Sequence, residues 1–62
     1  MTANETRNAI AVIEHDLKVG NLEHARKTMN HIFDGEWSEA TIEQIATACV
    51  HVEEKLQEAG LL

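Results

Sequence analysis

Apolar residues recur along this chain at the three- and four-residue spacings typical of amphipathic helices, and no segment shows the alternation typical of strands. The pattern predicts three helices, over about residues 3–19, 22–33 and 39–59. Each of the three glycines follows one of these segments, where a helix commonly ends on a left-handed residue. We therefore predict an all-α fold with one small helical domain over residues 1–62. In this domain an N-terminal helical hairpin is followed by a longer third helix, and the three helices form a small bundle.

The first predicted helix is apolar over a wide sector. Thr6, Ile10, Ile13 and Leu17 share one face at 100° per residue, and an adjoining arc carries Ala9, Val12 and Val19. Either this helix contacts two internal neighbours, or one sector is an interface. The second segment begins at Asn21, a favourable N-cap, and its apolar face comprises Leu22, Ala25, Met29, Ile32 and Phe33.

The third helix has two competing starts. Ser38 is the favoured N-cap, because Trp37 and Ile42 then occupy the two positions of a hydrophobic staple. A capping box formed by Thr41 and Gln44 is the alternative. Trp37 is interpreted first as the staple residue and, alternatively, as an exposed anchor for a partner, since tryptophan is enriched among interface hot spots.

The third helix also carries a heptad-like seam of apolar residues with spacings of three and four: Ile42, Ile45, Cys49, Val52 and Leu56. We expect this seam to be core, either within one chain or between two copies. A 62-residue chain is near the lower size limit for independent folding, and its single cysteine excludes an internal disulfide. These considerations favour a homodimer. At the far end, Leu61 is placed to complete a Schellman motif with Leu56.

The net charge of −6 belongs to the second half of the chain. Residues 1–33 carry four acids and four bases, whereas residues 34–62 carry seven acids against Lys55 alone. Four of those acids form a predicted acidic ridge on the third helix: Glu39, Glu43, Glu54 and Glu58. The ridge is either a solvated face or a surface for a basic partner. A net negative balance disfavours direct binding to nucleic acid or to an anionic membrane.

No catalytic, cofactor or metal site is predicted. Cys49 lies on the apolar seam, where a thiol is inert. The histidines, His15, His24, His31 and His51, lack the close spacing of zinc ligands and are interpreted as surface residues. No basic, apolar leader and no membrane-length apolar run is present, so we expect a cytoplasmic location.

The segment from Gly20 to Ala25, with Met29, faintly resembles the turn and second helix of a tetratricopeptide hairpin. Ile13 replaces the small residue of that family, and no second repeat follows, so we interpret the likeness as hairpin geometry and not as membership.

The sequence predicts a non-enzymatic protein-binding regulator or inhibitor, similar in size and composition to small phage-type proteins. We expect its partner to be another protein with a basic or apolar surface, and the predicted contact residues are Val12, Val19, Trp37, Glu39, Glu43, Val50, Glu54 and Glu58. Two alternatives remain open, an acidic mimic of nucleic acid that blocks a basic binding site, and a structural subunit of a larger assembly.

Overall fold

The computed structural model describes residues 2–33 and 35–62, which form three α-helices and no strand. The helices are α1 (Ala3–Val19), α2 (Leu22–Ile32) and α3 (Ile42–Glu58). The predicted all-α class is therefore confirmed. At 17 residues α3 equals α1 in length, and it exceeds the 11 residues of α2. Over the described residues, no helix is both long enough and apolar enough to cross a membrane.

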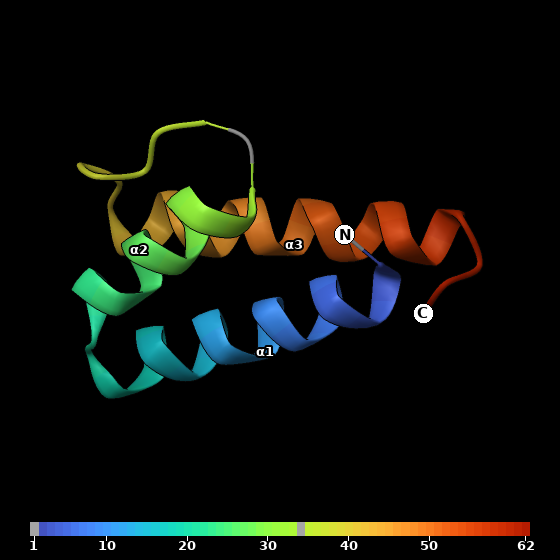
Figure 1. Cartoon of the computed structure of the whole chain (residues 1–62), viewed down its shortest axis with the longest axis horizontal. Coiled ribbons are helices and arrows are strands. Elements are labelled where there is room, and N and C mark those ends of the chain that lie inside the picture. The colour runs from blue at the N-terminus through green and yellow to red at the C-terminus, as the bar shows by residue number, and fades with distance from the viewer. Residues whose placement is uncertain (1, 34) are drawn as a thin grey trace.

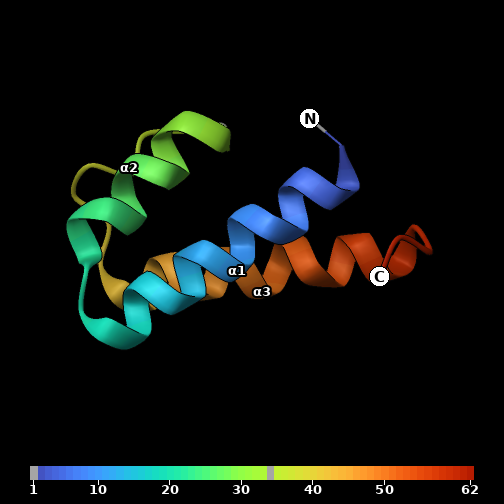
Figure 2. The ribbon, with the colours of Figure 1, turned by 60° about the horizontal axis from the view of Figure 1, so that its bottom comes forward.

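The helices form a compact body measuring 31 × 21 × 17 Å. α1 and α3 run in opposite directions and cross one another, and α2 packs at the end of the molecule opposite the two termini (Figures 1 and 2). α1 contacts both other helices, and its contact with α2 is the most extensive in the molecule. Contact with both α2 and α3 therefore accounts for part of the wide apolar sector of α1.

Local sequence signals fix both ends of the connection between α1 and α2. Gly20 adopts a left-handed conformation with φ of 81°, which glycine tolerates without a steric penalty. The N–H of Asn21 donates to the carbonyl of Asp16 over 2.7 Å, and that of Gly20 donates to Leu17 over 3.3 Å. The Asn21 side chain then accepts the N–H of His24 and caps α2. Two residues therefore suffice to turn the chain.

The start of α3 differs from the favoured prediction. Thr41, and not Ser38, is the N-cap, because its side chain and that of Gln44 form a reciprocal capping box. The residues at the two staple positions are consequently Ala40 and Ile45, which both belong to the core cluster. The pairing of Trp37 with Ile42 as a staple is therefore wrong, since Ile42 is 49% exposed.

The end of α3 has the expected hydrogen-bond pattern. The N–H of Leu61 donates to the carbonyl of Leu56 over 2.8 Å, and Gly60 donates to Gln57 over 3.0 Å. Gly60 has φ of 72°, so the two bonds and this left-handed residue make a Schellman motif.

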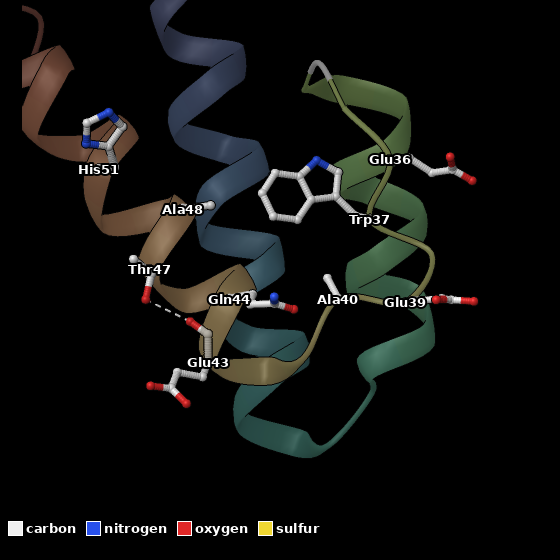
Figure 3. A pocket seen from close by; sticks show the side chains of 9 residues that line it. All are labelled: Glu36, Trp37, Glu39, Ala40, Glu43, Gln44, Thr47, Ala48 and His51. Carbon is white, nitrogen blue, oxygen red and sulfur yellow. Dashed lines mark hydrogen bonds between the residues drawn. The ribbon is translucent and has the colours of Figure 1, made fainter.

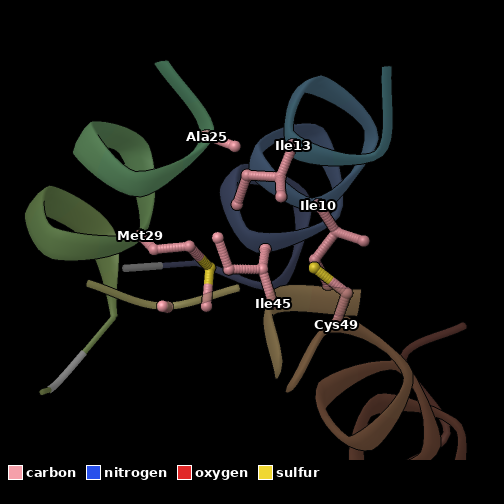
Figure 4. Packing of buried hydrophobic residues seen from close by; sticks show 7 residues of the cluster. Ile10, Ile13, Ala25, Met29, Ile45 and Cys49 are labelled. Atoms are coloured by element: carbon pink, nitrogen blue, oxygen red, sulfur yellow. The ribbon is translucent and has the colours of Figure 1, made fainter. Parts of the chain in front are cut away.

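The core lies where the three helices meet (Figure 4). Ile13, Met29 and Ile45 are its largest fully buried side chains, one from each helix. Around them lie four smaller or peripheral buried members: Ile10, Ala25, Ala40 and Cys49. So small a set explains why half-buried side chains such as Leu17, Phe33 and Val52 contribute to packing against it.

Candidate protein-binding groove

The segment between α2 and α3 and the outer face of α3 enclose a groove of about 830 Å³, which we call the α3 groove. Its lining consists of Glu36, Trp37, Glu39, Ala40, Glu43, Gln44, Thr47, Ala48 and His51. Figure 3 shows the two sides of this groove, with Trp37 and Ala40 on the segment side and Thr47, Ala48 and His51 on α3. The groove is open to solvent and combines an aromatic ring with small apolar groups, while the side chains of Glu36, Glu39 and Glu43 are directed away from the ring.

Side chains of α2 hold the segment that forms one wall. The Arg26 guanidinium donates from Nε to the carbonyl of Ala40 over 2.9 Å. The Asn30 side chain accepts the N–H of Trp37 and donates to the Ser38 hydroxyl. A turn closed by the bond from Ala40 N–H to the Trp37 carbonyl, 2.9 Å long, completes the wall. The wall is thus held by four hydrogen bonds although it has no regular secondary structure.

Trp37 is half-buried and packs against the core cluster while also lining the groove. Its ring presents its broad face in the view of Figure 3, and the six-membered ring is directed toward Ala48. The indole N–H is buried, lies near Gly35, and has no hydrogen-bond acceptor within residues 2–33 and 35–62. Trp37 therefore packs against the core and also has an accessible face. The sequence analysis treated packing and exposure as alternatives for this residue.

The predicted acidic ridge does not form a single line along α3. Because α3 begins at Ile42, Glu39 lies in the preceding turn and not on the helix. Glu39 and Glu43 line the groove together with Glu36, whereas Glu54 and Glu58 lie outside its lining. The four residues of the predicted ridge were expected to share one face of a single helix. The structure instead places Glu39 and Glu43 in the groove lining and Glu54 and Glu58 farther along α3.

The seam positions are used mainly inside the monomer. Ile45 and Cys49 are buried, and Val52 and Leu56 are half-buried against the same cluster. Ile42 is exposed and does not belong to the core. The remaining predicted contact residues, Val12, Val19 and Val50, are 45%, 61% and 52% exposed and lie outside the groove lining.

A second, smaller cavity lies between α1 and the C-terminal part of the chain, lined by Arg7, Ile10, Ala11, Glu14, Glu53 and Leu62. Here the Glu53 side chain hydrogen bonds to the Glu14 carboxyl. This bond, together with partial burial and charge repulsion, raises the pKa of Glu14.

Burial, followed by the charges of Glu14 and Glu53, raises the pKa of the Cys49 thiol to about 11. Such a thiol is a poor nucleophile at neutral pH.

In the part of the chain that the structure describes, no group of three or more His, Cys, Asp or Glu side chains lies close enough together to bind a metal ion. His24 instead pairs with Asp16, its Nδ1 lying 2.5 Å from the Asp16 carboxylate. His51 lines the groove, and Cys49 is buried on the core side of α3.

Sequence reasoning missed several groove residues, namely Glu36, Ala40, Gln44, Thr47, Ala48 and His51. The spacing from Gln44 to Thr47, Ala48 and His51 is helical, so the sequence predicts that these residues share one weakly polar face of α3. Nothing in the local pattern indicated that the irregular segment would fold along that face.

The chain was compared with protein-family models, with curated proteins and with solved structures, and no match was found in any of the three comparisons.

Proposed function

We propose that this chain is a non-enzymatic protein-binding module that regulates or inhibits its partner through the α3 groove. The observation that carries the proposal is the groove itself, which exposes one face of Trp37 and has Glu36, Glu39 and Glu43 among its lining residues, with their side chains directed away from the ring (Figure 3). Partially exposed tryptophan is a frequent interface anchor, and surrounding charges select the partner and accelerate encounter. The partner surface that fits best is basic with an apolar component.

Protein binding is preferred over mimicry of nucleic acid because of how the acids are distributed. Glu39 and Glu43 line the groove with Trp37, while Glu54 and Glu58 are about three and about four helical turns beyond Glu43. A phosphate mimic requires a continuous series of charges, whereas an interface anchor requires a few charges around an apolar centre.

The test uses tagged protein to capture partners from nuclease-treated lysate of its own source, at low and moderate salt. Glu39→Gln/Glu43→Gln is compared with Glu54→Gln/Glu58→Gln, which removes the same charge from α3 outside the groove. We expect one stoichiometric partner that the groove variant loses and the control variant retains. Equal loss with both variants would show bulk electrostatic attraction, and recovery of the chain alone would refute the proposal.

We further propose that the chain forms a homodimer through the exposed side of α3 rather than through its seam. Ile42, Ala46 and Val50 follow one another at four-residue spacing and are all exposed. None of the three lines the groove, so self-association and partner binding would use different surfaces.

A further inference from the structure

We infer that His24 is a phosphorylation site, whose ring nitrogen Nε2 accepts a phosphoryl group while Nδ1 remains hydrogen bonded to Asp16. The phosphoryl donor is a phosphoramidate, a compound in which phosphorus is bonded to nitrogen. Neither His24 nor Asp16 belongs to the lining of the α3 groove. The inference therefore goes beyond the protein-binding function proposed above and does not depend on it.

Asp16 occupies a position that is locally unfavourable for an acid. It is buried in the last turn of α1, where the partial negative charge of the helix C-terminus repels a carboxylate. Burial of a carboxylate is costly unless a partner compensates its charge. Among residues 2–33 and 35–62, the ion-pair partner of Asp16 is His24. A residue that contradicts local preferences in this way is a candidate for a functional role.

The turn between α1 and α2 fixes the geometry of this pair. The N–H of Asn21 donates to the backbone carbonyl of Asp16, and the Asn21 side chain accepts the N–H of His24. One intervening residue thus holds both members of the pair, one in the last turn of α1 and the other in the first turn of α2. The imidazole therefore needs little reordering before it reacts.

The contact with Asp16 determines which nitrogen of the ring is nucleophilic. Nδ1 of His24 lies 2.5 Å from the Asp16 carboxylate. Because a carboxylate only accepts hydrogen bonds, Nδ1 carries the hydrogen, and Nε2 of the neutral ring keeps a free electron pair. The His24 side chain is 54% exposed, so a donor can approach it from solvent. The same carboxylate stabilises the positive charge that the ring acquires when Nε2 reacts.

The reaction balances without a further reactant. The electron pair of Nε2 attacks phosphorus and forms an N–P bond, while the N–P bond of the donor breaks. The phosphoramidate reacts as its zwitterion, so its nitrogen leaves as neutral ammonia with the electron pair of the broken bond. No proton has to be transferred, because the hydrogen on Nδ1 stays in its bond to Asp16. The product is a phosphorylated imidazolium.

The charges around His24 favour an anionic group over a metal cation. His24 lies in the first turn of α2, where the helix dipole stabilises negative charge and repels cations. Lys27 is three residues farther along α2, and its 3.8 Å contact with Glu23 is exposed and therefore weak. Its ammonium group can turn to the phosphoryl oxygens. A dianionic phosphoryl group thus gains from surroundings that a metal ion would not.

The experiment treats the native chain with phosphoramidate at pH 8, where an ordinary histidine is neutral. The other three histidines, His15, His31 and His51, are exposed and serve as internal standards in the same molecule. We expect His24 to react about tenfold faster than any of them, because a hydrogen bond to a charged group stabilises the developing imidazolium. Mass spectrometry after digestion at alkaline pH locates the phosphoryl group, and ¹⁵N NMR identifies the phosphorylated nitrogen.

Equal rates at the four histidines, or attachment to Nδ1 of His24, would overturn the inference. The same holds if His24 keeps its advantage in the urea-unfolded chain, because the contact with Asp16 exists only in the fold. Both comparisons use the unmodified protein, so they decide the question even where a variant fails to fold.

Two matched substitutions then test the carboxylate. Asp16→Asn keeps the shape of the side chain and removes its charge, so we expect the rate at His24 to fall about tenfold and the standards to stay unchanged. Glu23→Gln removes the exposed acid beside His24 and should change that rate less than about twofold, because exposed charges interact weakly. Circular dichroism verifies that both variants are folded. A folded Asp16→Asn variant with the wild-type rate at His24 would reject the role of the carboxylate.

Discussion

Cys49 illustrates how packing sets the chemistry of a single residue. Its thiol is buried, and the pKa of about 11 leaves a very small thiolate fraction at neutral pH. We expect iodoacetamide at pH 8 to alkylate the native chain at least about 100-fold more slowly than the urea-unfolded chain, because the ordinary thiol pKa is about two units lower. Intact-mass spectrometry over time measures both rates. Native alkylation as fast as that of the unfolded chain would contradict the burial of this side chain.

Asp16 is the one buried charged residue among those described, and it joins the end of α1 to α2 through His24. Asp16→Ala should lower the free energy of unfolding by about 1–2 kcal/mol, because it removes a hydrogen bond between charged or polar groups. Urea denaturation provides the measurement. Glu23→Ala is the control: the Glu23–Lys27 pair is largely exposed, so its loss should cost less than about 0.5 kcal/mol. Equal effects would show that burial of Asp16 contributes nothing.

At the scale of elements, the start of α3 distinguishes two caps that both look acceptable in the sequence. Thr41→Ala should destabilise the protein by about 1 kcal/mol, because the Gln44 N–H loses its acceptor and the capping box is broken. Ser38→Ala, which removes only an exposed bond to Asn30, should stay within about 0.5 kcal/mol. Thermal unfolding followed by circular dichroism compares the two. A larger effect at Ser38 would move the cap back to the position first favoured.

The contact between α1 and α3 brings two carboxyl groups together, and this gives stability a pH dependence. The folded state raises the pKa of Glu14 above its ordinary value of 4.5, so the folded chain binds this proton more tightly than the unfolded chain. The resulting stability is fully present below pH 4.5 and is lost as pH rises through the raised pKa.

Glu53→Gln should therefore raise the melting temperature at pH 7 and flatten its decline above pH 4.5. Because Glu14 is exposed, the gain is discounted to about 0.5 kcal/mol, or roughly 2–4 °C for a domain of this size. Melting curves between pH 4 and pH 8 for wild type, Glu53→Gln and Glu54→Gln supply the comparison. If Glu54→Gln has the same effect, general charge reduction and not the Glu14–Glu53 contact is responsible.

For the whole molecule, the monomer already covers most of the seam that suggested a dimer. Ile42, Ala46 and Val50 are exposed, and they are the positions through which we propose that the chain self-associates. We expect sedimentation equilibrium to give a dimer at tens of micromolar, and Val50→Asp to give a folded monomer, because a charge in an apolar contact is costly. Ile45→Asp should instead unfold the chain, since Ile45 is fully buried in the core. A wild-type monomer at all concentrations would refute the dimer.

The local sequence was sufficient wherever a signal acts within one or two turns. The helical periods, the glycine after α1, the Asn21 cap and the Schellman motif at Leu61 all depend on neighbours in the chain. The local sequence does not determine the start of α3, because Ser38 and Thr41 both satisfy the local rules for a cap. Packing decided between them, since a start at Thr41 places Ala40 and Ile45 in the core and releases Ile42 to the surface.

The sequence by itself thus determined the all-α class, the two-residue turn and the acidic character of the second half of the chain. Only the tertiary structure decided that Trp37 faces both the core and a groove, that Glu39 and Glu43 separate from Glu54 and Glu58, and that Glu14 meets Glu53. The physical reason is the range of the interactions. Helix periods and caps are set by adjacent residues, whereas the groove depends on Arg26 and Asn30 holding a distant irregular segment against the fold.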